Sequence, residues 1–376
     1  MSTSIGSGIF QQMAKATPLL EIHRRNGAEL VETNGWILPA HFGATAKEYD
    51  AVRSAVGLLD MCDYAALHIT GPDRVSYLQG MVSNDVKKLS PGSGVYAAVL
   101  DVNGKILADL RVLCTEDSFI LLVWEPLKDK VIAQLNRYLV ADDVEIRDEA
   151  AGHGMISIQG PHALLLLNAI APRQDPPVQM YGHRLLRVGE REIRAVRSTH
   201  TGEEGFDLLM EMGDLVPVVE ELERAGAALS LRWAGLQAQD ILRVEAGIPR
   251  YGIDMDEENL LLETGLDQAV SFQKGCYIGQ EVIERVRSRG HVNRKLAGIV
   301  LAGKSPADRG DKITSDGKEI GKITSSVFSP RLRHAIALGY AHRDYLQPGM
   351  SVFIERNDAQ VAGTISALPF IYATSP

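Results

Sequence analysis

The chain has 376 residues, of which 45% are hydrophobic and 23% are charged, so it is long enough for two or three globular domains with their own cores. Its formal net charge of -9 excludes a general affinity for polyanions, and nucleic-acid binding is not expected unless a local basic segment provides it. Three cysteines, far apart in the sequence, form neither a disulfide framework nor a Cys-x-x-Cys knuckle, which indicates a reducing compartment.

Targeting and metal-binding signals are absent from the sequence pattern. The first residues lack both a basic segment and an apolar stretch, so we expect no secretory signal. The longest apolar runs, around 119–124 and 164–167, are too short to cross a bilayer. The histidines show neither His-x-x-x-His spacing nor a His/Cys pair, so no preformed metal site is expected. These features predict a cytoplasmic protein without a membrane anchor.

A strand-turn-helix unit occurs twice in the first half of the chain. In each copy a short apolar strand stops at a Gly-Pro pair, at 71–72 and again at 160–161, and a helix follows. We expect each proline at the first helical position, where its missing N–H is harmless. The chain therefore contains two related modules.

The region between these copies predicts a compact mixed unit. Three strands and one amphipathic helix are expected, at 95–100, 105–113, 119–124 and 128–139. Asn103-Gly104 is the turn signal of a hairpin between the first two strands. This hairpin-linked order indicates an α+β unit over about 51–149 and argues against a doubly wound parallel sheet.

The second module continues into strands and helices, and the chain then changes character. Alternating strands are expected at 184–197 and 205–210, and helices at 215–225 and 231–245. Beyond Asn293, short strands separated by turn residues are expected at 296–301, 319–325, 336–340, 350–354 and 360–365. The C-terminal part is therefore predicted to be a small antiparallel β-barrel or sandwich.

Residues 274–281 read Lys-Gly-Cys-Tyr-Ile-Gly-Gln-Glu and combine a cysteine, a lysine and the start of a predicted helix. The Lys274 ammonium and the positive helix terminus both favour the thiolate form of Cys276. We therefore treat Cys276 as a candidate nucleophile and Lys274 as its supporting group. The alternative is a small buried cysteine without a chemical role.

This octapeptide resembles the signature of the YgfZ family, folate-binding relatives of the glycine-cleavage T-protein that support iron-sulfur proteins. Segments at 38–42, 51–60, 83–86, 201–207 and 242–247 also look like T-protein segments. The resemblance implies an α+β fold, a three-domain T-protein cloverleaf around a central channel that holds tetrahydrofolate. The implied domains are a discontinuous folate-binding domain, a ferredoxin-like domain and a C-terminal β-barrel domain, at 1–50 plus 150–290, 51–149 and 291–376.

Folate binding requires a carboxylate for the adjacent N–H donors of the pterin ring. The resemblance implies that Glu203, in a Thr-Gly-Glu-Glu-Gly turn, is this carboxylate, and Glu204 is the candidate one residue away. The alternative for both is a solvated acidic turn.

The folate tail carries carboxylates and requires cations. The resemblance implies Arg243 as a cation for this tail, although Arg243 could instead pair with Asp240 or Glu245. We also expect Tyr96 and Asn84 to contact folate.

The chain departs from the T-protein at a paired acidic motif that follows a Gly-Gly turn in that enzyme. The matching stretch is 104–110, where Ala108 occupies the position of the aspartate tied to aminomethyl transfer. Asp109 remains, but neighbouring side chains of a strand point to opposite faces, so Asp109 is not expected to replace it. Because alanine cannot accept a proton, this departure weakens the aminomethyltransferase interpretation and fits the YgfZ group.

The segment 285–295 is the densest positive stretch of the chain. If it is extended, Arg285, Arg287 and Arg289 share one face. This face is a candidate binding site for a polyglutamylated folate tail or for a phosphate-bearing partner such as RNA. The alternative is a solvated run that pairs with nearby carboxylates.

Three functions follow from these observations. The first is a tetrahydrofolate-binding accessory protein for iron-sulfur cluster assembly or repair, in which Cys276 serves client or assembly proteins. One cysteine cannot hold a cluster alone, so a partner would supply further thiolates. The second is a folate-dependent aminomethyl- or methyltransferase that uses another residue, such as Asp109. The third is a non-catalytic scaffold that has kept the fold and lost the ligand.

Overall fold

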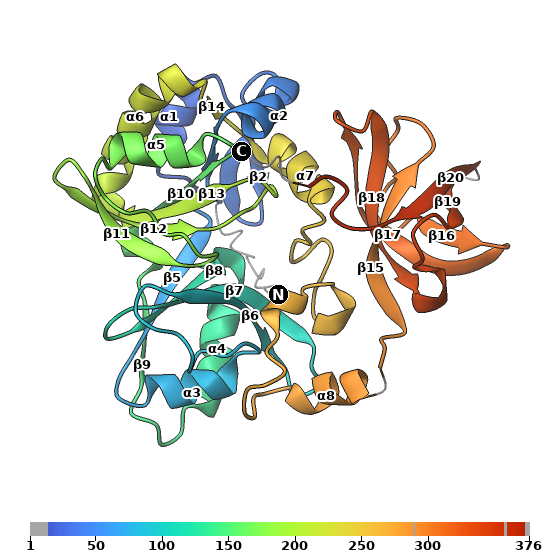
Figure 1. Cartoon of the computed structure of the whole chain (residues 1–376), viewed down its shortest axis with the longest axis horizontal. Helices are drawn as coiled ribbons and strands as arrows, with labels where there is room; N and C mark the ends of the chain where they lie inside the picture. The colour runs from blue at the N-terminus through green and yellow to red at the C-terminus, as the bar shows by residue number, and fades with distance from the viewer. Residues whose placement is uncertain (1–13, 289, 357–358, 373–376) are drawn as a thin grey trace, which may run out of the picture.

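The computed structural model describes residues 14–288, 290–356 and 359–372, which form three lobes (Figure 1). Two lobes that each combine a sheet with helices lie against one another, and a β-barrel forms the third lobe beyond α7 (Leu236–Glu245). Within the described residues, every helix is too short or too polar to span a membrane. The α+β T-protein-like architecture with a C-terminal barrel is therefore confirmed.

The first lobe contains a six-stranded sheet in the order β11-β12-β13-β10-β4-β14. Its strands are β4 (Gly57–Asp60), β10 (His153–Gln159), β11 (His183–Val188), β12 (Arg191–Arg197), β13 (Gly205–Glu211) and β14 (Arg232–Trp233). Its helices are α1 (Leu20–Arg25), α2 (Thr45–Ser54), α5 (Ala163–Ile170) and α6 (Met212–Gly226), and a small sheet contains β1 (Lys15–Ala16), β2 (Glu29–Thr33) and β3 (Trp36–His41). Because β4 pairs with β10, residues 57–60 belong to this sheet and not to the 51–149 unit.

The second lobe contains a five-stranded sheet in the order β6-β7-β8-β5-β9. Its strands are β5 (Tyr64–Thr70), β6 (Gly94–Leu100), β7 (Ile106–Cys114), β8 (Phe119–Trp124) and β9 (Glu145–Asp148), and its helices are α3 (Arg74–Met81) and α4 (Lys128–Tyr138). The predicted strands and helix of this unit are all present. Asn103 and Gly104 lie in the connection between β6 and β7, which pair antiparallel as predicted.

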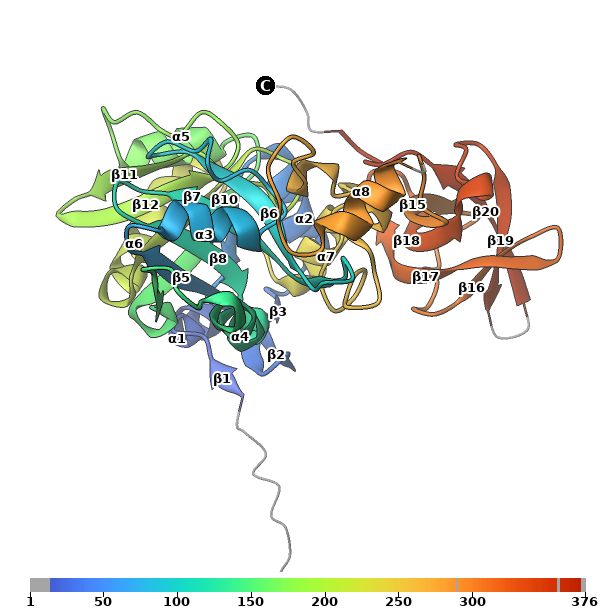
Figure 2. The same ribbon diagram turned by 90° about the horizontal axis from the view of Figure 1, so that it is seen from below.

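The two sheets pack face to face, and helices cover their outer faces (Figure 1). In the view from below, α3 and α4 lie in front of the five-stranded sheet (Figure 2). The layer between the sheets is apolar and contains Leu59, Met155, Val196 and Leu209 from one sheet and Ala66, Leu113, Ile120 and Leu122 from the other. On the outer face of the five-stranded sheet, a second apolar cluster includes Leu78, Leu135, Ala108 and Leu110. Alternate residues of β7 therefore face either the helices or the other sheet.

The two repeated strand-turn-helix units exist as β5–α3 and β10–α5. The prediction that proline takes the first helical position is wrong, because α3 begins at Arg74 and α5 at Ala163, two residues after each proline. The glycine of the turn, in contrast, is required by its backbone conformation and by the close approach of neighbouring backbone. Gly160 has φ +130, and a Cβ there would lie 2.6 Å from the carbonyl oxygens of Val52 and Ala55.

The C-terminal lobe is a closed barrel in the order β15-β18-β17-β16-β19-β20, in which β20 also pairs with β15. Its strands are β15 (Arg294–Leu301), β16 (Lys312–Ser315), β17 (Lys318–Ser329), β18 (His334–His342), β19 (Ser351–Arg356) and β20 (Ala359–Ser366). Closure leaves no exposed sheet edge. The sequence analysis missed β16, whose four residues are too few to show an alternating pattern.

The helix predicted over 231–245 is wrong at its start. Arg232 and Trp233 pair with β4 as β14, and α7 begins only at Leu236. Between them, Gly235 lies so close to β3 that a Cβ would be 2.5 Å from the carbonyl oxygen of Ala40. This close approach allows α7 to cross the first lobe toward the barrel, where it contacts β17 and β18.

Candidate functional site

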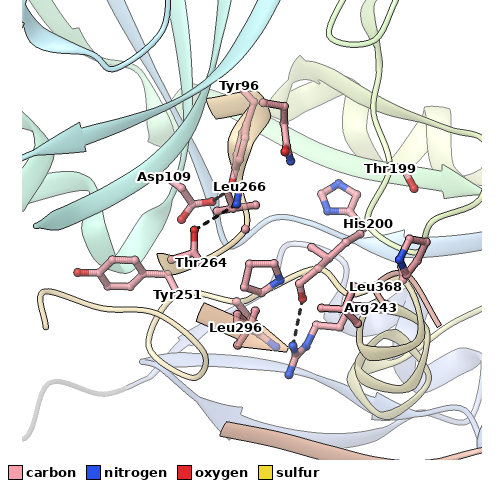
Figure 3. Close-up of a pocket in the computed structure, with 18 of the residues that line it drawn as sticks. Tyr96, Asp109, Thr199, His200, Arg243, Tyr251, Thr264, Leu266, Leu296 and Leu368 are labelled. Carbon is pink, nitrogen blue, oxygen red and sulfur yellow. Dashed lines mark hydrogen bonds between the residues drawn. The ribbon is translucent and has the colours of Figure 1, made fainter. Parts of the chain in front are cut away.

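A cavity of about 670 Å³ lies where the three lobes meet, within the size range of small-molecule sites. It is lined by β6 and β7, by the loop at Thr199 and His200, by the irregular segment 246–251 and 264–268, and by the barrel. Figure 3 shows Tyr96 and Asp109 opposite Thr199 and His200, with Arg243, Leu296 and Leu368 along the barrel side. Each lobe therefore contributes part of one site.

Asp109 is the acidic residue that β7 presents to this cavity. Its neighbour Ala108 is fully buried on the opposite face, in the apolar cluster beneath α3 and α4. Tyr96 O–H donates a hydrogen bond to Asp109 Oδ2 at 2.7 Å, and the Tyr96 ring stacks with that of Tyr181 at 6.0 Å. The sequence analysis took Ala108 for the decisive position, but strand alternation turns that side chain away from the cavity.

Two carboxyl groups of the cavity have raised pKa values because of burial. Burial raises the pKa of Asp109, although the Tyr96 hydrogen bond and Arg111 oppose the shift. Burial also raises the pKa of Asp63 to about 6, against the hydrogen bond from the Trp124 indole and the charge of Arg250. A carboxyl group that titrates closer to neutral pH can accept or donate a proton during a reaction.

Opposite Asp109, a buried carboxylate lies behind two cavity-lining side chains. Asp207 Oδ1 is 2.9 Å from His200 Nε2, and Asp207 Oδ2 is 3.7 Å from Arg111 Nη1. Burial alone would raise the pKa of Asp207, but His200 and Arg111 hold it below the ordinary value, so Asp207 is ionised. Its Oδ2 is buried and, apart from the ion pair with Arg111, makes no hydrogen bond with the described residues. Asp207 does not itself line the cavity, so it acts on the site through His200 and Arg111.

Glu203 and Glu204 do not line this cavity. Glu203 is buried, and its Oε1 accepts a hydrogen bond from Arg53 Nη1 at 2.7 Å. The same guanidinium binds Glu245 at 2.6 Å, so one arginine links two buried acids. Glu204 pairs with Arg197 at 3.1 Å and is partly exposed. The acid of 201–207 that contacts cavity-lining side chains is Asp207, which the sequence pattern does not indicate.

The other predicted folate contacts differ in position. Tyr96 lines the cavity, whereas the Asn84 side chain donates hydrogen bonds to the carbonyl oxygens of Tyr96 and Gln268, both at 2.8 Å. Asn84 therefore stabilises the backbone of the cavity wall, but its side chain does not line the cavity.

Arg243 lines the cavity but is held by the protein on every side. Its guanidinium donates to Asp240 and to Asp254, each at 2.7 Å, and to Ser325 Oγ at 2.8 Å. These bonds join α7 to the barrel strand β17. The ion pair with Asp240, one of the alternatives left open by the sequence, is present.

The octapeptide lies outside the cavity. The Lys274 ammonium is buried and donates to the carbonyl oxygens of Val82 and Asn84 at 2.6 and 2.8 Å. Burial lowers the pKa of Lys274 to about 7. Cys276 is exposed and is not among the residues that line the cavity. Lys274 therefore anchors this loop to the turn after α3, and the thiol faces outward.

Two arginines of the basic segment, Arg285 and Arg287, lie in a helix, so the condition of an extended strand with one arginine face is not met there. Helix α8 spans Gln280–Ser288. Arg285 pairs with Glu281 at 2.5 Å and Arg287 with Glu284 at 3.5 Å, both on the helix itself. Arg289 lies outside the described residues. The described arginines thus match the alternative of a solvated run with local carboxylate partners.

Comparisons with known proteins agree with this architecture. Residues 19–274 match the GCVT N-terminal domain, and residues 294–371 match the glycine cleavage T-protein C-terminal barrel domain. The fold and the three-lobed cavity define a protein of the T-protein class. The chain belongs to the glycine cleavage T-protein (aminomethyltransferase) family.

Relatives match over almost the whole chain. An aminomethyltransferase of Halothermothrix orenii is 32% identical over 358 residues, which is 95% of this chain and 100% of the relative. An aminomethyltransferase of Rubrobacter xylanophilus is 33% identical over 95% of this chain and 94% of its own length. The crystal structure of glycine cleavage system aminomethyltransferase T from Bartonella henselae superposes with a TM-score of 0.86 at 25% identity, covering 96% of this chain and 98% of that one.

Proposed function

We propose that the protein binds a reduced folate in the central cavity and acts as a folate-dependent aminomethyl- or methyltransferase. The observation that carries this proposal is Asp109, an acid with a raised pKa on the cavity wall of β7. In the sequence, Ala108 in place of an acidic residue argues against aminomethyl transfer. In the structure, Ala108 faces the apolar core and not the cavity. The names of the relatives described above, both aminomethyltransferases, support the same chemistry.

The chemical groups of the cavity fit a reduced folate. The stacked rings of Tyr96 and Tyr181 offer an aromatic wall for a flat ring system. His200 and Arg111, which Asp207 holds in place, line the cavity and offer hydrogen-bonding groups to a heterocycle edge. Cations for the tail carboxylates are present on the cavity wall at Arg250 and Lys295.

Tetrahydrofolate, when bound, supplies the amine nitrogens that accept a one-carbon unit. Asp109 is placed to hold a cationic amine while ionised and to move a proton at its carboxylate oxygens. Tyr96 fixes the orientation of this carboxyl group through its hydrogen bond to Oδ2. The Leu296 and Leu368 side chains, on the barrel side, exclude water from part of the cavity.

Asp109→Asn tests this proposal. The variant should lower tetrahydrofolate-dependent one-carbon transfer from an aminomethyl or N-methyl donor by about 10²–10⁴-fold, because the amide cannot accept a proton. Asp129→Asn, which changes an exposed aspartate of α4 in the same lobe, is the matched control and should leave the rate unchanged. Absence of transfer in the wild-type protein, or full transfer in Asp109→Asn, would contradict the proposal.

A second candidate, an accessory function in iron-sulfur cluster assembly or repair, rests on the octapeptide and on the exposed Cys276. An exposed thiol is accessible to a client or assembly protein in the reducing, cytoplasmic environment that we expect. Cys276→Ser should lower the iron-sulfur enzyme activity of clients in cells while leaving one-carbon transfer in vitro intact. If clients retain full activity in that variant, the cysteine has no such role.

A further inference from the structure

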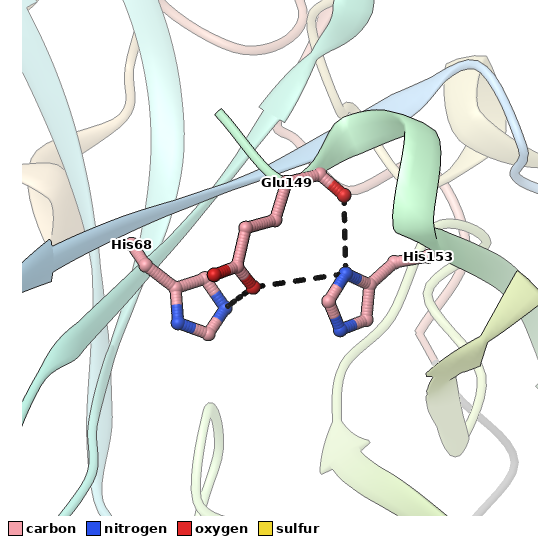
Figure 4. Close-up of side chains that lie close together, drawn as sticks. All are labelled: His68, Glu149 and His153. Atoms are coloured by element: carbon pink, nitrogen blue, oxygen red, sulfur yellow. Dashed lines mark hydrogen bonds and ion pairs between the residues drawn. The ribbon is translucent and has the colours of Figure 1, made fainter. Parts of the chain in front are cut away.

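His68 meets Glu149 and His153, which follow it much later in the sequence, at the junction of the first two lobes (Figure 4). His68 belongs to β5, Glu149 follows β9, and His153 is the first residue of β10. Each of the three side chains offers one ligand atom, and these atoms all lie within 4.8 Å of one another. The histidine spacing in the sequence did not reveal this cluster.

The carboxylate of Glu149 lies between the two imidazole rings. Its Oε2 is 3.2 Å from His68 Nε2 and 4.0 Å from His153 Nδ1. A tetrahedral zinc ion with bonds of about 2.0–2.2 Å has ligand atoms about 3.4 Å apart. The first distance already fits, and the second requires the His153 ring to move by less than about 1 Å, a change within the reach of one side-chain rotation.

The backbone holds the cluster in place. Glu149 N–H donates to the carbonyl oxygen of Ala66 at 3.1 Å, which fixes the glutamate beside β5, two residues from His68. His153 Nδ1–H donates to the carbonyl oxygen of Glu149 at 3.1 Å, so binding of an ion by Nδ1 requires the ring to turn from this carbonyl and its proton to shift to Nε2. The buried His68 Nε2 lies 3.2 Å from Glu149 Oε2 but makes no hydrogen bond of good geometry with the described residues. A bond to a metal ion would satisfy this nitrogen.

The surroundings favour a cation with an open coordination position. His68 and His153 line a cavity of about 750 Å³ that is separate from the central one. This cavity also contains four carboxylate and two guanidinium side chains, namely Glu190, Glu192, Glu211, Asp214, Arg191 and Arg194. Arg191 pairs with Asp214, and Arg194 donates to His183. Acidic groups therefore outnumber basic ones around the cluster.

We propose that His68, Glu149 and His153 bind one divalent transition-metal ion of the zinc class. Two imidazoles and one carboxylate form a donor set that suits zinc and leaves a fourth position for water from the cavity. Because the ligands come from β5 and from the segment that returns to β10, the ion joins the two sheet-containing lobes. The bound ion stabilises the contact between these two lobes.

Zinc titration of the full-length protein after chelator treatment tests this site. We expect about one equivalent of Zn²⁺ to bind with a Kd of about 1 µM or below, and Co²⁺ in its place to give the visible absorption of a four-coordinate ion. The double variant His68→Ala/His153→Ala should weaken binding by at least about 100-fold. His334→Ala, which removes an exposed histidine of the barrel, is the control and should bind as the wild type does.

Thermal unfolding separates loss of the site from loss of the fold. Zn²⁺ should raise the Tm of the wild type and of His334→Ala, but not that of the double variant. Glu149→Gln is the second variant, since it keeps the shape of the side chain and removes the charged ligand. It should retain the unfolding transition of the metal-free protein and lose most of the Zn²⁺ affinity. Wild-type protein that binds no Zn²⁺, or variants that bind it unchanged, would overturn the proposal.

Discussion

The protein contains two clusters of buried charges that look alike by composition and differ in their position relative to the central cavity. Each leaves one polar atom, Arg53 Nε or Asp207 Oδ2, without a hydrogen bond to the described residues. In the first, Arg53 bridges Glu203 and Glu245, and Tyr49 O–H donates to Glu245 at 2.9 Å. This cluster joins α2, α7 and the loop before β13. In the second, His200 and Arg111 flank Asp207, whose Oδ2 makes no hydrogen bond within the described chain.

Position relative to the cavity distinguishes the two clusters. A buried charge is costly unless it is paired, so the ion pairs of the Arg53 cluster are explained by structure alone. Asp207 has two partners, His200 and Arg111, that both line the central cavity, whereas Arg53, Glu203 and Glu245 do not line it. A binding site is therefore indicated by a buried charge whose partners face a cavity and not by acidity in the sequence.

The largest expected effect concerns stability. Glu203→Ala leaves Arg53 with one carboxylate, and it should lower the free energy of unfolding by about 3–5 kcal/mol in urea denaturation. Glu204→Ala is the matched control, because its pair with the partly exposed Arg197 is worth about 1 kcal/mol or less. A variant at Glu203 that keeps its stability but loses folate would place this residue in the binding site.

The next effect concerns affinity. Asp207→Asn removes the charged acceptor behind His200, so calorimetry should show tetrahydrofolate binding weakened by about 10- to 100-fold. Near-ultraviolet circular dichroism of the same sample checks that the fold is intact. Unchanged tetrahydrofolate affinity in a folded Asp207→Asn protein would show that Asp207 does not support the binding site.

A smaller effect concerns pH and the octapeptide loop. The pKa of Lys274 is lowered to about 7, below its value of about 10.5 in the unfolded chain. Above pH 7 the unfolded chain holds a proton that the folded protein has released, so stability rises with pH through this window. From pH 7 to 8 the free energy of unfolding should increase by about 1 kcal/mol more in the wild type than in Lys274→Met. Identical pH slopes would show that this lysine does not titrate there.

The smallest effect is a displacement of the pH–rate profile. Tyr96→Phe removes a hydrogen bond that lowers the pKa of Asp109, so the pKa of Asp109 should rise further. If ionised Asp109 is required, the acid limb of the profile moves to higher pH, with the maximal rate largely retained. A limb that stays in place would separate Tyr96 from the ionisation of Asp109.

Elements were predicted correctly where their bounds depend on residues adjacent in the sequence. The apolar run 119–124 forms β8 with the predicted bounds, since turn residues flank it on both sides. The start of α7 could not be predicted, because it depends on the close approach of Gly235 to β3. Tyr96 and Asp109 are candidate site residues in the sequence, but only the structure places them on the wall of the cavity. That Glu203 lies away from the cavity depends on Arg53, which lies 150 residues before it and could not be inferred from local sequence.

The direction of the side chains on β7 decides which residue acts in the cavity, and a rescue experiment tests this direction. Ala108→Asp restores the acidic pair of the family motif, but this side chain points into the apolar cluster beneath α3 and α4. The measurement is the rate of one-carbon transfer in the double variant Ala108→Asp/Asp109→Asn. We predict that the rate stays as low as in Asp109→Asn alone and that the double variant is less stable. Recovery of transfer would contradict the assignment of Asp109 as the residue that acts in the cavity.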